Sequence, residues 1–170
     1  MHAHVIVDSP IGPLTLVAVR GGALTGLYLS APRSGSARHE PADDMLGPRA
    51  DPAAEPFAVA ADQLAAYFAG RLTEFTLPLA PAGTPFQRRV WAGLQDIPYG
   101  ETWSYGQLAG KIGNPAAVRA VGLANGRNPI AVVIPCHRVI GADGSLTGYG
   151  GGLERKRFLL DLEAGVRQLV

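Results

Sequence analysis

The sequence contains a single cysteine, Cys136, among its 170 residues. One thiol excludes an intramolecular disulfide and any metal site built on a cysteine pair. No apolar run approaches the roughly 18 residues that a membrane-spanning helix needs. Residues 1–5 lack the basic and apolar regions of a signal peptide. The sequence therefore predicts a cytoplasmic protein in which Cys136 is either a buried small hydrophobic residue or a nucleophile.

An excess of charge is also lacking, because the formal net charge is only +1. The charges are unevenly placed: residues 1–85 hold 5 basic and 8 acidic residues, whereas residues 86–170 hold 10 and 6. The half that contains Cys136 is thus positive by four charges, which suggests an anionic partner but is weak on its own. No GxxxxGK[ST] phosphate loop occurs, although residues 148–152 are rich in glycine.

The first half of the sequence predicts a small sheet followed by a helix. The Gly21-Gly22 pair indicates a hairpin turn, and the Pro/Ala/Gly segment 78–83 is typical of a hinge between domains. The expected elements, in order, are strands at residues 5–8, 13–20 and 23–30, a long surface loop at 31–55, an amphipathic helix at 56–70 and a strand at 72–77.

The second half predicts mainly short helices, at residues 84–97, 104–113, 116–124 and 153–164. The first begins with Thr84 as N-cap, proline at N1 and glutamine at N3, and Ser104 opens the second with the same capping box. The second and third helices, joined by a tight turn, are typical of a helix-turn-helix, although an ordinary corner between two helices fits the same pattern.

The apolar run 130–134 leads through Pro135 into Cys136-His137-Arg138. An imidazole and a guanidinium beside a thiol form a cationic setting that favours thiolate. Neighbouring side chains of an extended chain point in opposite directions, so proton transfer between Cys136 and His137 would need a bend or a bridging water.

Eight segments of the second half occur together in one order: Phe86–Trp91, Ile97–Thr102, Ser104-Tyr105, Arg119–Gly122, Asn128-Pro129, Pro135–Val139, Gly148–Gly152 and Leu159–Glu163. In this set the sequence resembles the O6-alkylguanine-DNA alkyltransferases, or methylated-DNA–protein-cysteine methyltransferases. The first half matches more loosely, through Asp8–Gly12 and Tyr67–Gly70.

The resemblance implies a small α/β N-terminal domain in residues 1–80 and a mainly helical, winged-helix-like domain with a helix-turn-helix in residues 84–170. It implies direct-reversal DNA repair, in which an alkyl group on O6 of guanine, or O4 of thymine, passes irreversibly to Cys136 after base flipping. The implied partner is double-stranded DNA that contains O6-alkylguanine. We expect a monomer without a cofactor, a membrane association or an obligate protein partner.

The resemblance also implies a catalytic group of Cys136, His137 and Glu163. A thiolate is the strong soft nucleophile that displacement at an alkyl carbon needs. In the family a water links thiol and imidazole, and a glutamate that corresponds to Glu163 orients the far side of the imidazole, as in other nucleophile–base–orienter triads. Taken alone, Glu163 would be interpreted as a solvated helix residue.

A base inside a duplex must be extruded before it can react. By resemblance Arg119 fills the gap that the flipped base leaves, and Tyr105 helps to rotate the nucleotide. Ser104 belongs to the same DNA-binding group, and the small residues Ala120 and Gly122 let the helix approach DNA closely. The alternatives are a phosphate contact or surface salt bridge for Arg119 and core packing for Tyr105.

Four further residues match the family's pocket. Tyr149, Gly150 and Gly151 correspond to the loop that reads the flipped base, where glycine permits close backbone approach, and Asn128 corresponds to an asparagine that braces the segment before the nucleophile. A plain flexible loop and a turn residue are the respective alternatives.

Some family members hold structural zinc in the N-terminal domain through cysteine and histidine. Here that domain contains no cysteine, and its histidines His2, His4 and His39 form no ligand cluster in the sequence. We therefore expect no metal site.

Three other functions are compatible with parts of the sequence. A non-enzymatic damage-binding protein of the same architecture would lack the nucleophile, so Cys136 argues against it. A cysteine hydrolase would turn over an ester or thioester, whereas a thioether offers water nothing to attack. A transcription factor that senses alkylation would need a second cysteine or a further DNA-binding domain.

Overall fold

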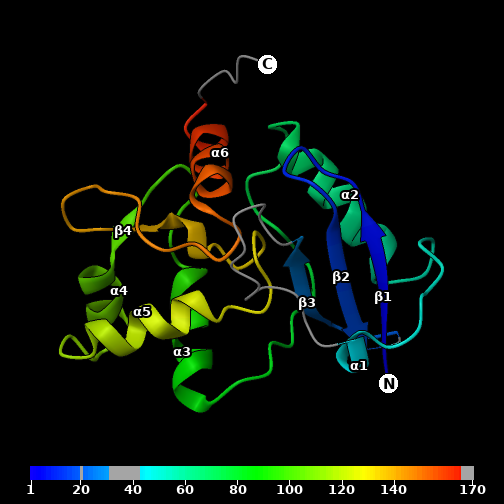
Figure 1. The fold of residues 1–170 in the computed structure, drawn as a ribbon, viewed down its shortest axis with the longest axis horizontal. Helices are drawn as coiled ribbons and strands as arrows, with labels where there is room; N and C mark the ends of the chain where they lie inside the picture. The colour runs from blue at the N-terminus through cyan, green and yellow to red at the C-terminus, as the bar shows by residue number, and fades with distance from the viewer. Residues whose placement is uncertain (20, 31–42, 166–170) are drawn as a thin grey trace.

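The computed structural model describes residues 1–19, 21–30 and 43–165 (Figure 1). A three-stranded antiparallel sheet and helix α2 (Phe57–Phe68) occupy one side of the molecule, and helices α3 (Pro85–Leu94), α4 (Tyr105–Lys111) and α5 (Val118–Gly126) occupy the other (Figure 1). The two-domain architecture expected from the sequence is therefore confirmed. No helix in these ranges is long and apolar enough to cross a membrane.

The sheet has the strand order β1 (His2–Val7), β2 (Leu14–Val19), β3 (Leu24–Leu29). Its three strands confirm the predicted ones to within a few residues. The central strand β2 pairs with a neighbour at both edges and is nearly continuous in apolar residues, of which Leu14, Leu16, Val17 and Ala18 are buried. Helix α2 contributes Phe57, Ala60, Leu64 and Tyr67 to the same hydrophobic core. The predicted apolar face of that helix is thus the buried face.

Two predictions for the first half are wrong in detail. Residues 31–42 lie outside the described ranges, but the rest of the predicted loop contains the short helix α1 (Asp43–Leu46) and a segment that pairs with β1 through Ala50 and His4. Residues 72–77 form no strand, because the backbone N–H of Thr76 donates to the side-chain oxygen of Gln63 instead of to a neighbouring strand.

Local capping determines where two of the helices begin. The side chains of Thr84 and Ser104 each accept a hydrogen bond from the backbone N–H of the glutamine three residues later. The side-chain oxygen of each glutamine in turn accepts a hydrogen bond from the backbone N–H of the cap residue. Both predicted capping boxes are confirmed. Helix α3 ends at Leu94, three residues before the predicted end, and α5 begins two residues later than predicted.

The helices are followed by a buried connection and a final helix, α6 (Leu153–Glu163). Strand β4 (Trp103–Ser104) pairs in parallel with β5 (Val139–Ile140), a pairing between residues 36 positions apart that the sequence did not predict. The helical character of this domain is confirmed, whereas its winged-helix character stays a prediction.

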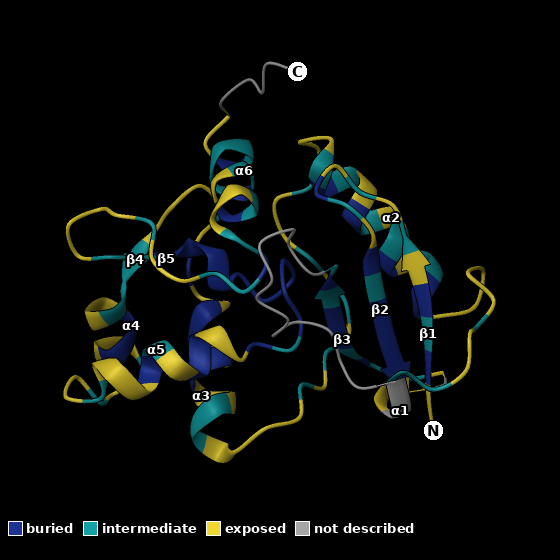
Figure 2. Ribbon diagram, viewed as in Figure 1, coloured by how far each residue is buried: buried dark blue, intermediate teal, exposed yellow. Residues whose placement is uncertain are grey.

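The two halves share one hydrophobic core. Leu27 of β3 donates to the carbonyl of Pro129 at 2.9 Å and accepts from the N–H of Ala131 at 3.2 Å. The segment that leads to Cys136 is therefore attached to the N-terminal sheet. Residues 131–139 are buried throughout, which Figure 2 shows as the dark blue path between α5 and β5.

Candidate active site

Cys136 begins a single 3-10 turn, η1 (Cys136–Arg138), and is only 6% exposed. The run before it is folded into turns, since the N–H of Ile134 donates to the carbonyl of Ile130 at 2.9 Å and Val132 adopts a positive φ of 70°. The backbone is therefore bent here, and the opposite side-chain directions of an extended chain do not apply. The turn supplies a bend in the backbone at this motif.

Two asparagines brace this turn from within the core. The side-chain amide of Asn128 donates to the carbonyl of Ile134 at 2.8 Å and its oxygen accepts from the N–H of Ile130 at 3.0 Å. Asn125 donates to the carbonyl of Cys136 at 3.5 Å. Buried backbone groups at an irregular turn need such partners, so both amides hold the nucleophile's backbone in place.

Behind the thiol lies a buried polar cluster around Glu163, at the end of α6. Its Oε2 forms a hydrogen bond with Nε2 of His137 at 2.7 Å, and its Oε1 accepts a hydrogen bond from Nε of Arg138 at 2.7 Å. Arg138 adds a bond to Oε2 at 3.1 Å and donates to the carbonyl of Ile97 at 2.7 Å. The hydroxyl of Tyr67 donates to Oε2 at 2.5 Å. His137, Arg138 and Tyr67 thus all bond to one carboxylate.

The protonation states follow from this cluster. Burial would raise the pKa of Glu163, but the hydrogen bonds and charges of His137 and Arg138 lower that pKa from 4.5 to about 2. Burial lowers the pKa of His137, so the imidazole is neutral at neutral pH. Its Nδ1 is buried and has no hydrogen-bond partner among the described residues. Nε2 of the ring therefore bonds to Glu163, and Nδ1 is available to accept a proton.

The thiol is not held as a thiolate at rest. Burial raises the pKa of Cys136, and the hydrogen bond from Asn128 and the charge of Lys156 only partly oppose this. The cationic setting expected from the adjacent His137 and Arg138 is wrong because Arg138 is paired with Glu163 and His137 is neutral. Reaction at Cys136 therefore needs a base.

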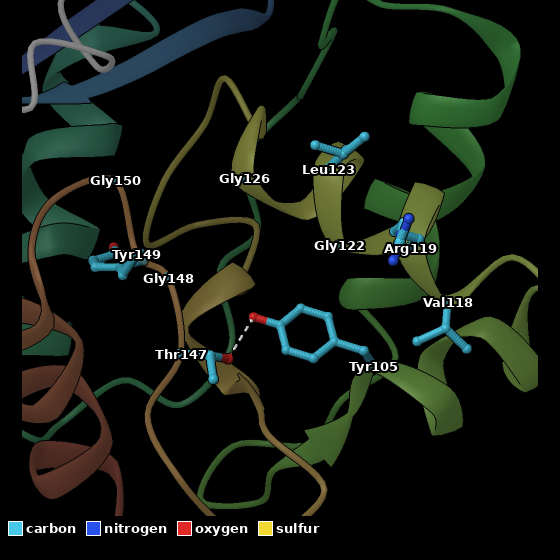
Figure 3. A pocket seen from close by; sticks show the side chains of 10 residues that line it. All are labelled: Tyr105, Val118, Arg119, Gly122, Leu123, Gly126, Thr147, Gly148, Tyr149 and Gly150. Atoms are coloured by element: carbon cyan, nitrogen blue, oxygen red, sulfur yellow. Dashed lines mark hydrogen bonds between the residues drawn. The ribbon is translucent and has the colours of Figure 1, made fainter.

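An open pocket of about 830 Å³ lies between α4, α5 and the loop after β5. Figure 3 shows Tyr105 between the loop that carries Thr147 and the helix that carries Val118 and Arg119. The hydroxyl of Thr147 donates to that of Tyr105 at 3.0 Å, across the pocket. Arg119 is exposed at the rim, where it can reach a partner in solvent.

Cys136 lines a second, much smaller recess of about 10 Å³. The recess shares Gly126, Gly148, Tyr149 and Gly150 with the open pocket, so the thiol lies directly behind the glycine loop. The hydroxyl of Tyr149 is buried and has no partner among the described residues. A buried, unpaired hydroxyl beside a nucleophile is suited to bind a polar group of a ligand.

Comparison with known proteins identifies this architecture. The sequence model of the 6-O-methylguanine DNA methyltransferase ribonuclease-like domain matches residues 2–81, and that of the DNA-binding domain of the same protein matches residues 85–165. The methylated-DNA–protein-cysteine methyltransferase of Mycobacterium bovis is 59% identical over 157 residues, which are 92% of this chain and 89% of that protein. The chain belongs to the 6-O-methylguanine DNA methyltransferase family.

More distant relatives and solved structures agree with this membership. The methylated-DNA–protein-cysteine methyltransferase of Methanosarcina acetivorans is 51% identical over 94% of this chain and 97% of that protein. The crystal structure of Mycobacterium tuberculosis OGT in complex with DNA matches with a TM-score of 0.86 and 56% identity, covering 96% of this chain and 94% of that chain. The fold of the family is thus the fold of this chain over nearly its whole length.

Within this methyltransferase fold the structure brings most of the predicted site residues together. Cys136, His137 and Glu163 form one buried group, and Asn128 braces it. The remaining predicted residues lie on the pocket or beside it: Tyr105, Arg119, Gly122, Tyr149 and Gly150 line the open pocket, Gly151 lines the recess, Ser104 is the N-cap of α4, and Ala120 is exposed on α5.

Two buried polar residues of this candidate site, Tyr67 and Lys156, are absent from the sequence predictions, and Arg138 was expected only as a cationic neighbour of the thiol. Arg138 and Tyr67 share the carboxylate of Glu163, and Lys156 is fully buried. The Nζ of Lys156 donates to the carbonyls of Val139 at 2.5 Å and Thr147 at 2.8 Å, and burial lowers its pKa from 10.5 to about 8. The helical spacing of Lys156, Leu159 and Glu163 on one face of α6 was a signal that could have indicated its burial.

The predicted absence of metal stays a prediction. In the described ranges no group of three or more His, Cys, Asp or Glu residues could hold a metal ion. His4 instead makes a 3.0 Å bond with the carbonyl of Gly47, and His39 lies outside those ranges.

Proposed function

We propose that this chain repairs DNA by direct reversal, moving an alkyl group from O6 of guanine in duplex DNA to Sγ of Cys136. The observation that carries the proposal is the position of the only thiol, directly behind the loop of an open pocket and in front of a buried His137–Glu163 pair. Transfer forms an S–C bond and breaks the C–O6 bond. The electron pair of the broken bond returns to the guanine, and the proton lost by the thiol balances its charge.

The base for this step is His137. Its lowered pKa keeps the imidazole neutral at neutral pH, and its unpaired Nδ1 is free to take the proton of Cys136 through a bridging water. Glu163 accepts a hydrogen bond from the opposite ring nitrogen, Nε2, and stabilises the imidazolium once it forms. A positioned base of this kind contributes roughly 10²–10⁴-fold in rate.

The exposed face of α5 is the proposed DNA contact. Arg119 fills the gap of the flipped base and Tyr105 assists its rotation, while Ala120 and Gly122 leave room for close approach of the duplex. A methyl group added to Gly122 would lie 3.7 Å from the ring of Tyr105, so this position faces Tyr105. Ser104 begins the helix that carries Tyr105.

The loop of Tyr149, Gly150 and Gly151 receives the flipped base, and Asn128 holds the turn that carries the nucleophile. The same pocket is proposed to take O4-alkylthymine. The proposed domains are residues 1–80 and 84–170. The proposed location is the cytoplasm.

Intact-protein mass spectrometry after incubation with duplex DNA bearing O6-methylguanine tests this function. We expect one added methyl group per chain, located on Cys136, and repair that stops at one equivalent because a thioether resists water and the sequence holds no second thiol. Cys136→Ser should bind DNA and transfer nothing. Sustained turnover with excess substrate, or unmodified protein beside repaired DNA, would contradict the proposal, and hydrolysis of a generic thioester would favour a cysteine hydrolase.

A further inference from the structure

Tyr67 links the N-terminal domain to the reactive cluster. It lies in the last turn of α2, is fully buried, and its hydroxyl donates to Oε2 of Glu163 although the two residues are 96 positions apart in the chain. The other donors to that carboxylate come from the motif that contains the nucleophile. Tyr67 is the one contribution of the N-terminal domain to this cluster in the part of the chain that the structure describes.

The surroundings of Tyr67 leave its ring little freedom. Its ring contacts those of Phe68 and Phe75, each at a centroid distance of 5.2 Å, and that of Tyr99 at 6.3 Å. A buried tyrosine hydroxyl needs a hydrogen-bond partner, and aromatic packing sets the direction in which it points. The hydroxyl is thus aimed at Glu163 by the core of the N-terminal domain.

The hydrogen bond has a defined polarity. Burial and the charge of Glu163 raise the pKa of the Tyr67 phenol far above its ordinary value, so the hydroxyl keeps its proton and can only donate to the carboxylate. Oε2 is also the oxygen that faces Nε2 of His137 at 2.7 Å. With Arg138 on both oxygens and Tyr67 on Oε2, the carboxylate plane has one orientation in which every donor is satisfied.

We propose that Tyr67 is a positioning residue for alkyl transfer, which fixes Glu163 so that His137 is held as the Nε2–H tautomer with Nδ1 available as the base. This inference rests on the proposed function. By donating to Oε2, Tyr67 also withdraws negative charge from the oxygen that faces the imidazole, which keeps the imidazole from binding a proton too readily. The N-terminal domain is therefore part of the reactive apparatus and not only a scaffold.

Tyr67→Phe removes this hydroxyl and keeps the ring. Tyr99→Phe is the matched control, because Tyr99 packs against the same ring but its hydroxyl bonds to no described residue. Single-turnover transfer from free O6-benzylguanine, measured as a function of pH, isolates the chemical step from DNA binding. Loss of one hydrogen bond to a charged group corresponds to about a 10-fold slower reaction, up to about 100-fold. The acid limb of the pH–rate profile should move to higher pH, because the carboxylate then holds the imidazolium more strongly.

A ¹⁵N NMR titration of the histidine rings supplies a readout that packing alone would not change. The chain has four histidines, so the His137 signals can be assigned with a single substitution. We expect the Nε2–H tautomer in the native protein, a raised His137 pKa in Tyr67→Phe and an unchanged one in Tyr99→Phe. Tyr67→3-fluorotyrosine keeps the donor and strengthens it, so it should retain the native rate to within about threefold and lower the His137 pKa.

The proposal is overturned if Tyr67→Phe folds and reacts within twofold of the native rate with an unmoved acid limb. It is also overturned if the fluorinated variant leaves the His137 titration unchanged, a measurement that decides the matter even where Tyr67→Phe does not fold. Failure of the native protein to alkylate Cys136 would instead remove the proposed function, which the mass measurement detects separately.

Discussion

Glu163→Gln is the most informative single substitution, because this carboxylate forms hydrogen bonds with three buried side chains, those of Tyr67, His137 and Arg138. The pKa of Glu163 is lowered from 4.5 to about 2 in the folded protein. At neutral pH the hydrogen bonds from His137 and Arg138 and the charge of Arg138 stabilise the ionised carboxylate, and the loss of hydrogen bonds to a charged group costs about 1.5–3 kcal/mol. The folded pKa is the depressed one, so this stability is fully present above pH 4.5 and is lost as the pH falls toward 2.

The free energy of unfolding of the variant at pH 7 should therefore be lower by about 1.5–3 kcal/mol. Its difference from the native protein should narrow between pH 4.5 and 2. An amide also cannot satisfy both sides of the cluster. If its NH₂ group faces His137, the ring is forced into the tautomer that protonates Nδ1; if it faces Arg138, a buried guanidinium loses an acceptor. Either arrangement should slow alkyl transfer, on the order of 10²–10⁴-fold.

Urea unfolding monitored by tryptophan fluorescence, repeated from pH 7 to pH 3, measures the stability, and single-turnover transfer from O6-benzylguanine measures the rate. Asp161→Asn is the control on the same helix, because Asp161 makes no hydrogen bond or ion pair with any described residue. The lowered pKa of His137 adds a separate loss of stability below pH 6.5 in the native protein. A folded Glu163→Gln protein with native stability and native rate would show that the carboxylate neither supports the fold nor orients the base.

Four further outcomes are expected. Arg119→Ala should lose far more repair rate on duplex substrate than on free O6-benzylguanine, which needs no extrusion, and equal losses would exclude a role in base flipping. Lys156→Met should slow transfer on both substrates, because the two carbonyls that the ammonium bridges lose their donor; an unchanged rate would contradict a role in holding the loop. Gly151→Ala should lower the melting temperature, since its methyl group would lie 2.3 Å from a Leu29 carbon. Gly148→Ala is the control, because its methyl group meets nothing within 4 Å. Equal melting temperatures in the two variants would show that the Leu29 side chain can move to accommodate the methyl group. Duplex affinity should be moderate and fall with salt by a slope of about −0.9 per phosphate contacted, which filter binding at several salt concentrations checks.

The sequence by itself determined what depends on neighbours along the chain. The capping boxes at Thr84 and Ser104 are confirmed because an N-cap and its N3 residue satisfy each other within one turn. The hairpin at Gly21-Gly22 and the apolar face of α2 follow from local turn chemistry and helical period in the same way. The eight segments that carried the family resemblance placed Cys136, His137 and Glu163 together before any geometry was known.

Only the tertiary structure decided how those three residues interact. The strand predicted at 72–77 is absent because Gln63, from another element, takes a backbone donor of that segment. The thiol is not a resting thiolate because burial, which the sequence around Cys136 does not reveal, outweighs the charge of its neighbours, and Arg138 turns to Glu163 instead. Tyr67 and Lys156 reach the site from positions where the local pattern indicates at most burial in the core and no contact with the reactive group. Hydrogen bonds across long sequence separations depend on the packing of whole elements, and that packing is what placed a tyrosine of the first domain on the carboxylate of the second.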